Sequence, residues 1–449
     1  MTVDVVIKNG LTVLPSGITQ SSIVIDGGKI IGIMKSSEPD ADRVFDASGK
    51  VVLPGMIDMH VHLRDPGFPE RENFESGTRA AAAGGVTTVI DMPNTVPATV
   101  TLEAFKQKQA IVDKKSLVDF GFIGGAGEVP KEDIIAVADA GATAFKSFLI
   151  ARFKELAAND YTLFKHMQLL GELDRPLLVH AENGVMVDKF MEEAIASGRT
   201  DPLAHCDFRP DICEIEAIMR TVTLASETDV HLHICHMSAG GGVDILEWAQ
   251  GMGQMVTGET STNYLLFTRE TMEERGPYAK VDPPLRSKDD QVRLWEGLND
   301  GTIDVLASDH APYTKEEKER GFDNIYDAPS GGVVIETTLP LMLDAVNNDK
   351  MSLERLVEVF STNPAQMNGL YPLKGDLMLD ADADIVICDM DMPFHIKGEN
   401  LQTIQKITPY EDMKGKGMPV MTLVRGEVVY ENGQVVGKPG YGVFQSPLE

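Results

Sequence analysis

Eight short apolar runs, separated by longer helix-like stretches, fill the middle of the 449-residue chain. Runs that are apolar without alternation are typical of parallel strands buried on both faces. Eight strand–helix repeats are the number that closes a (β/α)₈ barrel, so we predict an α/β fold built on a TIM-like barrel. The runs are Met56–His62, Val86–Met92, Val118–Ile123, Ala142–Leu149, Pro176–Ala181, His231–His236, Gln254–Glu259 and Ile303–Asp309. The helix-like stretches include Phe74–Ala83, Glu132–Ala140, Tyr161–Leu173, Glu214–Ala225 and Lys288–Leu298.

The two ends of the chain have a different pattern, with short strand-like segments joined by tight turns. Asp26-Gly27-Gly28 and Asn432-Gly433 are hairpin signals, because residues that tolerate a positive φ suit the primed turns of hairpins. We therefore predict a small composite β-sandwich made from both termini. It would comprise residues 1–53 and 372–449, with the barrel between them at residues 54–371.

Charge and cysteine usage narrow the classes of function. The formal net charge of −29 disfavours nucleic acid and anionic membrane surfaces as partners. Four cysteines form neither a CxxC pair nor a disulfide framework, which fits the reduced thiols of the cytoplasm. The N-terminus lacks the apolar core of a signal peptide, and no apolar run approaches the ~20 residues that span a bilayer. We expect a cytoplasmic enzyme that acts on a small molecule.

Residues with metal-binding or acid–base chemistry end several of the predicted strands, where barrel enzymes place their active sites. His60 and His62 end the first run, two residues apart, so both imidazoles face one side of the strand and can hold one divalent ion. An isolated pair of this kind is more often two surface histidines. Here His180 and Asp309 end two further runs, although the chain has only ten histidines, and this favours a metal site.

Lys146 lies in the fourth run, within the segment Phe145-Lys146-Ser147-Phe148. Burial penalises the charged form of a lysine and favours the neutral amine. A neutral amine can add carbon dioxide and form a carbamate, an anion able to bridge two metal ions. The alternative is a lysine whose ammonium group reaches solvent at the end of the strand.

The sixth run offers three histidines. Strand alternation places His231 and His233 on one face and His236 on the other, so spacing alone leaves the choice open. His236 is preferred because it ends the run, just before a glycine-rich segment. Asp309 could ligate a metal ion and also take a proton from the attacking water. The alternative interpretation of Asp309 is that its carboxylate caps a turn or a helix.

As a set, these residues resemble the motifs of the cyclic amidohydrolases, which are the dihydroorotases, allantoinases and hydantoinases. The resemblance covers nearly the whole chain. It implies two divalent ions, expected to be zinc, that are bridged by N6-carboxylysine at Lys146. It also implies that His236, and not His231 or His233, is the metal ligand from the sixth run. The implied ligands are His60, His62 and Asp309 for one ion, His180 and His236 for the other, and the Lys146 carbamate for both. The matching segments are Pro54–His62, Phe145-Lys146, Val179–Asn183, Cys235–Ser238, Ser308–Pro312 and Asp382–Val386.

The substrate motifs divide between the branches of the family. Leu63–Gly67 and Asp91–Thr95 are similar to dihydroorotases, in which the residues matching Arg64 and Asn94 hold the carboxylate of the substrate. An arginine suits that contact because it can bind a carboxylate through two parallel hydrogen bonds. The alternative is an arginine paired with Asp65 or Glu70. The segments Lys280–Arg286 and Thr314–Lys318 are also similar to dihydroorotases.

Other positions depart from dihydroorotases. Tyr313 and Asn263 replace histidines, and Asp282 stands where an asparagine is usual. The region Leu169–Ala217 is more similar to allantoinases and hydantoinases, yet Ala151 stands where hydantoinases carry a tyrosine. We predict that the substrate contacts are Arg64, Asn94, Asp282 and Tyr313.

Together these features predict a dinuclear-metal hydrolase that opens the C–N bond of a cyclic amide or ureide. The first expectation is a dihydroorotase-like enzyme that interconverts dihydroorotate and N-carbamoyl-aspartate. The alternative is a cyclic ureide hydrolase of the allantoinase or hydantoinase type. A metal-free scaffold of the same fold is a distant third, because all six ligand positions are present. Barrel enzymes that resemble this chain commonly form dimers or tetramers, so we also expect a homo-oligomer.

Overall fold

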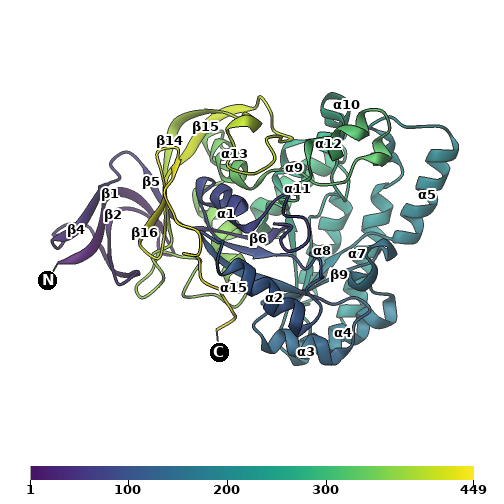
Figure 1. The fold of residues 1–449 in the computed structure, drawn as a ribbon, viewed down its shortest axis with the longest axis horizontal. Coiled ribbons are helices and arrows are strands. Elements are labelled where there is room, and N and C mark those ends of the chain that lie inside the picture. The colour runs from purple at the N-terminus through teal and green to yellow at the C-terminus, as the bar shows by residue number, and fades with distance from the viewer. Residues whose placement is uncertain (1, 449) are drawn as a thin grey trace.

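The computed structural model describes residues 2–448, and a barrel of eight parallel strands lies at its centre (Figure 1). Each strand pairs with the next one along the chain. The ring is completed where Val61 forms an isolated parallel bridge with His310 and the His62 amide donates to the His310 carbonyl at 2.8 Å. The predicted barrel is confirmed. Its strands are β6 (Met56–Val61), β7 (Val86–Asp91), β8 (Asp119–Gly125), β9 (Ala144–Phe148), β10 (Leu177–His180), β11 (Leu232–Ile234), β12 (Val256–Thr260) and β13 (Val305–Leu306).

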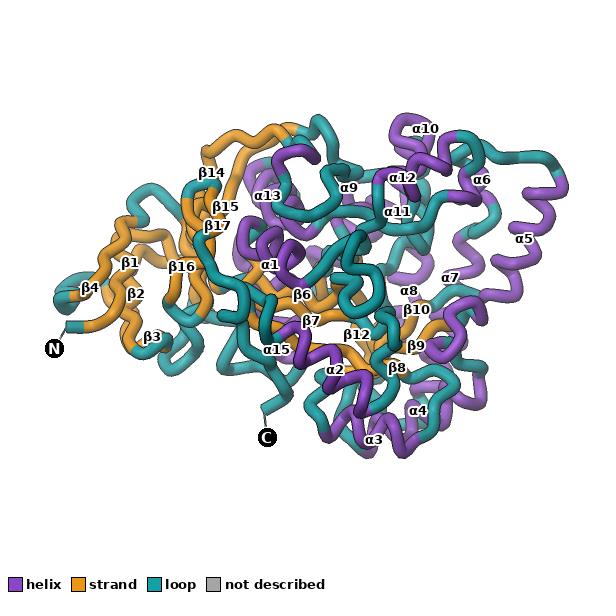
Figure 2. Tube along the Cα trace, in the orientation of Figure 1, coloured by secondary structure: helices purple, strands orange, loops and turns teal. Residues whose placement is uncertain are grey.

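Helices surround the barrel strands, which lie inside them in Figure 2. Side-chain caps fix where several of them begin: Asn73 and Ser76 form a capping box at α1, and Ser287 and Asp290 form another at α11. Among residues 2–448, no helix has the length and apolarity to cross a bilayer. The longer helices are α1 (Phe74–Ala83), α2 (Leu102–Val112), α3 (Lys131–Asp139), α4 (Asp160–Glu172), α5 (Gly184–Ala196), α7 (Asp211–Ala225), α8 (Gly240–Gly251), α11 (Lys288–Asp300) and α13 (Ile335–Asn347).

Shorter helical segments lie in the loops and after the last barrel strand. They are α6 (Ala204–Asp207), α9 (Thr262–Leu266), α10 (Thr271–Arg275), α12 (Lys315–Glu319), α14 (Leu353–Val357) and α15 (Asn363–Met367). Short 3₁₀ segments accompany them, and one of these, Ala151–Leu156, follows β9 at the mouth of the barrel and is interrupted at Lys154, whose φ is 51°. Several of these segments carry residues of the site described below.

Both termini build a second sheet beside the barrel, so the predicted composite β domain is confirmed. β5 joins the two halves, because it pairs with β1 on one side and antiparallel with β14 on the other. Buried apolar side chains from both halves, such as Ile25 and Ile385, share one cluster. The exact boundaries at residues 53/54 and 371/372 stay predictions. The strands are β1 (Val3–Leu14), β2 (Gly17–Asp26), β3 (Lys29–Met34), β4 (Ala41–Asp46), β5 (Val51–Pro54), β14 (Ile385–His395), β15 (Lys414–Val424), β16 (Glu427–Glu431) and β17 (Gln434–Val435).

A single glycine separates the composite sheet from the first barrel strand. Gly55 lies between β5 and β6, and a Cβ atom built there would approach the Thr87 side chain to 2.1 Å. No larger residue fits this contact without moving β7, so Gly55 allows β6 to lie close against its neighbour. Because His60 follows on the same strand, this packing also fixes the first predicted metal ligand.

Candidate dinuclear metal site and substrate pocket

The first predicted ligand group meets at the C-terminal end of the barrel. His60 lies in β6, His62 follows it, and Asp309 follows β13. The Asp309 Oδ1 atom lies 3.5 Å from His60 Nε2 and 3.4 Å from His62 Nε2. One ligand atom from each of the three residues lies within 4.8 Å of the others. This arrangement could hold one divalent ion between two imidazoles and a carboxylate.

The second group lies beside the first. His180 ends β10 and its Nδ1 atom is 3.0 Å from Nε2 of His236, which follows β11. The His60 and His236 rings are 5.4 Å apart between centroids, so the two groups adjoin. Lys146 on β9 is fully buried, and within the described part of the chain its Nζ atom has no hydrogen-bond partner. The structure therefore places this lysine inside the barrel and not with its head in solvent.

Positive φ angles turn three of the predicted side chains at the ends of their strands. Arg64, His236 and Asp309 have φ values of 62°, 37° and 52°. Such angles are uncommon for residues other than glycine and concentrate at functional sites. At His236 the reversal breaks the strand alternation, which is why spacing alone could not choose it over His231 and His233. Those two share one face, because both contact Thr257.

The donor set fits two borderline-soft divalent ions such as zinc. Metal-binding histidines must be neutral. Burial lowers the pKa of His62 to about 3, and burial next to His180 lowers the pKa of His236 well below its ordinary value. The buried, unpartnered amine of Lys146 is the position at which a carbamate would supply the shared carboxylate.

Glu259, at the end of β12, supports both groups and was not among the predicted site residues. Its carboxylate is hydrogen-bonded to His60 Nδ1, accepts from the His236 amide at 3.1 Å and lies 3.3 Å from His233 Nε2. Burial opposes protonation of His60, but Glu259 and Asp309 outweigh it and raise the pKa of His60 to about 10. A divalent ion on the opposite ring nitrogen would take the place of that proton. Glu259 ends the predicted seventh run, so its position was visible in the sequence.

Glu259→Gln is expected to weaken metal binding about 10- to 100-fold, because carboxylates behind metal-binding histidines orient the ring and raise its basicity. Competition of the apoprotein with a chromophoric chelator measures this affinity. Glu336→Gln is the matched control, since Glu336 is a half-buried glutamate that accepts a hydrogen bond from the Gln402 amide. Unchanged affinity in a folded Glu259→Gln protein would rule out this supporting role.

A hollow of about 330 Å³ opens above these groups, and all ten predicted site residues line it. Its volume suits a small ring with a substituent. Further side chains complete the wall, including two aromatic rings from β9 and the turn that follows it. The lining residues beyond the predicted ones are Phe148, Arg152, Phe153, Lys280, Ala311, Tyr326, Ala328, Pro329, Ser330 and Gly331.

Arg64 lies against one side of this pocket. Its guanidinium carbon is 4.5 Å from the centre of the Tyr313 ring, and its Nε donates to the Pro312 carbonyl at 3.2 Å. The alternative pairing with Asp65 does not occur, because Asp65 pairs with Lys115 at 2.6 Å. Across residues 2–448 Arg64 forms no ion pair, so its charge is available to a ligand.

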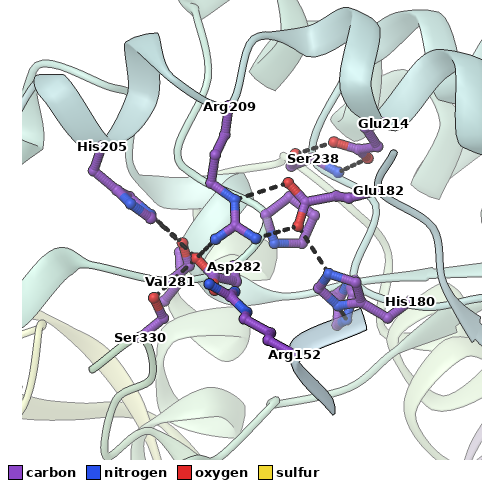
Figure 3. A network of polar contacts seen from close by, with 12 residues as sticks. Arg152, His180, Glu182, His205, Arg209, Glu214, Ser238, Val281, Asp282 and Ser330 are labelled. Carbon is purple, nitrogen blue, oxygen red and sulfur yellow. Dashed lines mark hydrogen bonds and ion pairs between the residues drawn. The ribbon is translucent and has the colours of Figure 1, made fainter. Parts of the chain in front are cut away.

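The carboxylate of Asp282, in contrast, is already held by protein groups. Arg152 Nη2 lies 2.6 Å from it, Ser330 Oγ donates to it at 2.8 Å and Arg209 forms a second ion pair (Figure 3). Burial raises the pKa of this carboxyl, but Arg209 and Arg152 outweigh that and hold it well below its ordinary value. Asp282 therefore lines the pocket with its charge already neutralised by Arg152 and Arg209. A direct contact between Asp282 and the substrate stays a prediction.

Comparison with known proteins gives a consistent result. The Amidohydrolase family model matches residues 51–429. The L-hydantoinase of Paenarthrobacter aurescens is 39% identical over 98% of this chain and 97% of its own length, and an allantoinase of Enterococcus faecalis is 35% identical over 99% of each.

Solved structures agree with these relatives. An L-hydantoinase (dihydropyrimidinase) from Arthrobacter aurescens superimposes with a TM-score of 0.97 at 38% identity, covering 99% of this chain and 100% of the other. A dihydropyrimidinase from Brevibacillus agri gives 0.93 at 32% identity over 98% of each chain. The chain therefore belongs to the amidohydrolase family, among the cyclic amidohydrolases, and is a hydrolase of carbon–nitrogen bonds in cyclic amides.

Proposed function

We propose that the protein opens a cyclic ureide of the hydantoin or allantoin type, with two divalent metal ions held by the six predicted ligands. The observation that carries this proposal is the meeting of four histidines, one aspartate and one buried, unpartnered lysine in a chain that is similar over its full length to an L-hydantoinase and to allantoinases. This reverses the order of our two expectations, because the similarity over whole chains to an L-hydantoinase and to allantoinases favours the alternative over a dihydroorotase.

Bound at this site, the ions would make water nucleophilic near neutral pH and polarise the ring carbonyl. Burial raises the pKa of the Asp309 carboxyl, but His60 and His62 outweigh it and hold that pKa below its ordinary range. Asp309 is therefore ionised and can accept the proton of the attacking water. As the oxygen bonds to the carbonyl carbon and the C–N bond breaks, Asp309 returns the proton to the leaving ring nitrogen.

The remaining pocket groups would orient the ring. Asn94 has a buried Oδ1 atom without a hydrogen-bond partner in the described chain, so it can accept from a ring N–H. Phe148 and Phe153 offer an apolar wall to a ring substituent. We also expect a cytoplasmic homo-oligomer, and the four cysteines are all free and buried, as reduced thiols would be.

The test is steady-state ring opening by the zinc-loaded protein with a 5-substituted hydantoin, allantoin and dihydroorotate side by side. We expect kcat/KM for one of the two uncharged ureides to exceed that for dihydroorotate about tenfold or more. Arg64→Ala should change that uncharged reaction less than about threefold, because no carboxylate needs its charge. A preference for dihydroorotate that disappears in Arg64→Ala would contradict this choice of substrate.

Dihydroorotate is the second candidate, and one observation favours it. Arg64 presents an unpaired guanidinium to the pocket, and Asn94 lines the same hollow. Burying an arginine without a carboxylate is costly unless a ligand supplies one. The Arg64→Ala comparison therefore separates the two candidates directly.

A further inference from the structure

A chain of charged side chains connects a candidate metal ligand to the mouth of the pocket (Figure 3). His180 Nε2 lies 2.8 Å from Glu182, on the side of the ring away from His236. Arg209 donates to Glu182 through two hydrogen bonds of 2.9 and 3.1 Å and pairs with Asp282 through its remaining nitrogen. Arg152 closes the chain on the far side of Asp282.

Arg152 differs from the other members in its exposure. The side chains of Glu182 and Arg209 are almost completely buried and that of Asp282 is 14% exposed, whereas that of Arg152 is 45% exposed. The two carboxylates are balanced by two guanidinium groups only while Arg152 is in place. Without it, Arg209 alone faces two carboxylates, and the wall of the pocket carries a net negative charge at Asp282.

The segment that carries Arg152 also shapes the pocket. Ala151–Leu156 follows β9, and its Phe153 ring stacks on Phe148 with 4.0 Å between centroids. The same ring lies 6.0 Å from the ring of His180. Arg152 makes the one ion pair that residues 151–156 form with the rest of the described chain. This contact adds an ionic link to the apolar packing of Phe153 and Leu156, so it is the one charged tie between the aromatic wall and the opposite loop.

We infer that Arg152 is a specificity-determining residue, which neutralises Asp282 and fixes Phe153 so that the pocket selects the ring substituent. The inference rests on the proposed function. With Arg152 docked, this part of the wall offers the Phe148 and Phe153 rings beside an Asp282 carboxylate that is neutralised, which suits an uncharged aromatic or aliphatic substituent. With Arg152 removed, Asp282 would share its remaining guanidinium partner, Arg209, with Glu182, and the excess negative charge would repel an anionic substituent, since like charges in a partly buried site interact strongly.

Arg152→Gln tests the inference in the zinc-loaded enzyme, with unsubstituted, 5-benzyl and 5-carboxymethyl hydantoin as probes. KM for the carboxymethyl compound should rise about tenfold and that for the benzyl compound about threefold, both relative to KM for unsubstituted hydantoin. Arg152→Lys, which keeps the charge, should recover most of the difference. Arg43→Gln is the matched control, because Arg43 is 41% exposed and pairs with Glu427 in the composite sheet.

Amide hydrogen exchange gives a readout that does not depend on hydrolysis. Exchange in residues 150–158 should be faster in Arg152→Gln than in the parent or Arg43→Gln, and salt should narrow the difference by screening the pair. Unchanged KM ratios in Arg152→Gln would overturn the inference, whether or not exchange changes. If the parent enzyme opens none of the ureides, the proposed function fails, and unchanged exchange would then separately overturn the docking of Arg152.

Discussion

Replacing Asp309 by asparagine is expected to lower kcat at least about 10³-fold while the protein stays folded. The carboxylate lies within 3.5 Å of two candidate metal-binding nitrogens and is ionised, so it is placed both to ligate an ion and to carry the proton from water to the leaving nitrogen. Loss of a general acid–base group typically costs 10²- to 10⁴-fold, and an amide cannot accept that proton. Steady-state rates with the preferred ureide, together with metal content, measure the effect.

Asp304→Asn is the matched control for this variant. Asp304 directly precedes the same strand, β13, but lies at its opposite end, where its carboxylate accepts a hydrogen bond from the Gly258 amide at 3.0 Å. Residues at that face of a barrel act in stability and not in catalysis. We expect Asp304→Asn to keep its turnover. Near-normal turnover in Asp309→Asn would contradict the role given to Asp309.

Replacing Lys146 by alanine is expected to reduce bound zinc from about two ions per chain to about one or fewer, with a loss in kcat of about 10³-fold or more. Only a carbamate on this lysine would offer an oxygen to each ion, and a metal-assisted hydrolysis loses most of its rate when the ions are displaced. Elemental analysis of the dialysed protein and steady-state rates measure the two effects. Loading of the parent apoprotein should also be faster with added bicarbonate.

Addition of acetate to Lys146→Ala shows whether activity is lost because a carboxylate is missing or because the core is damaged. In Lys146→Ala the shortened side chain leaves room for a small carboxylate between the two ligand groups, so acetate should restore part of the activity. Lys146→Met fills the same space with an apolar chain and should not respond. Two bound zinc ions and ordinary turnover in Lys146→Ala would contradict the bridging role of the lysine.

Much of the fold could be predicted because the eight continuous apolar runs stand out clearly from the helix-like stretches between them. Phe74–Ala83 is a helix over the predicted residues, and each of the eight runs overlaps one barrel strand. The eighth run is longer than its strand, because only Val305–Leu306 of the predicted Ile303–Asp309 pairs in the sheet. Its last residues turn out of the ladder, and the positive φ of Asp309 has no signal in an apolar pattern.

The candidate ligands could be predicted because they end strands, whereas the groups that support them mostly could not. Arg209 lies in a loop between α6 and α7 and joins Glu182 to Asp282, which is 73 residues further along the chain than Arg209. No local pattern relates such distant positions. The same holds for the substrate class, because Arg64 and Asn94 suggest one branch of the family, whereas other lining residues, such as Phe153 and Ser330, come from loops far apart in the sequence.

The central claim is that this chain is a dinuclear-metal hydrolase of cyclic ureides, and zinc titration of the chelator-treated protein tests it most directly. Opening of a 5-substituted hydantoin and of allantoin would be followed as zinc is added in the presence of bicarbonate. We predict negligible activity without metal and a rise that saturates at about two zinc ions per chain. Full activity in the metal-free protein, or a fully loaded protein that opens neither ring, would contradict the account.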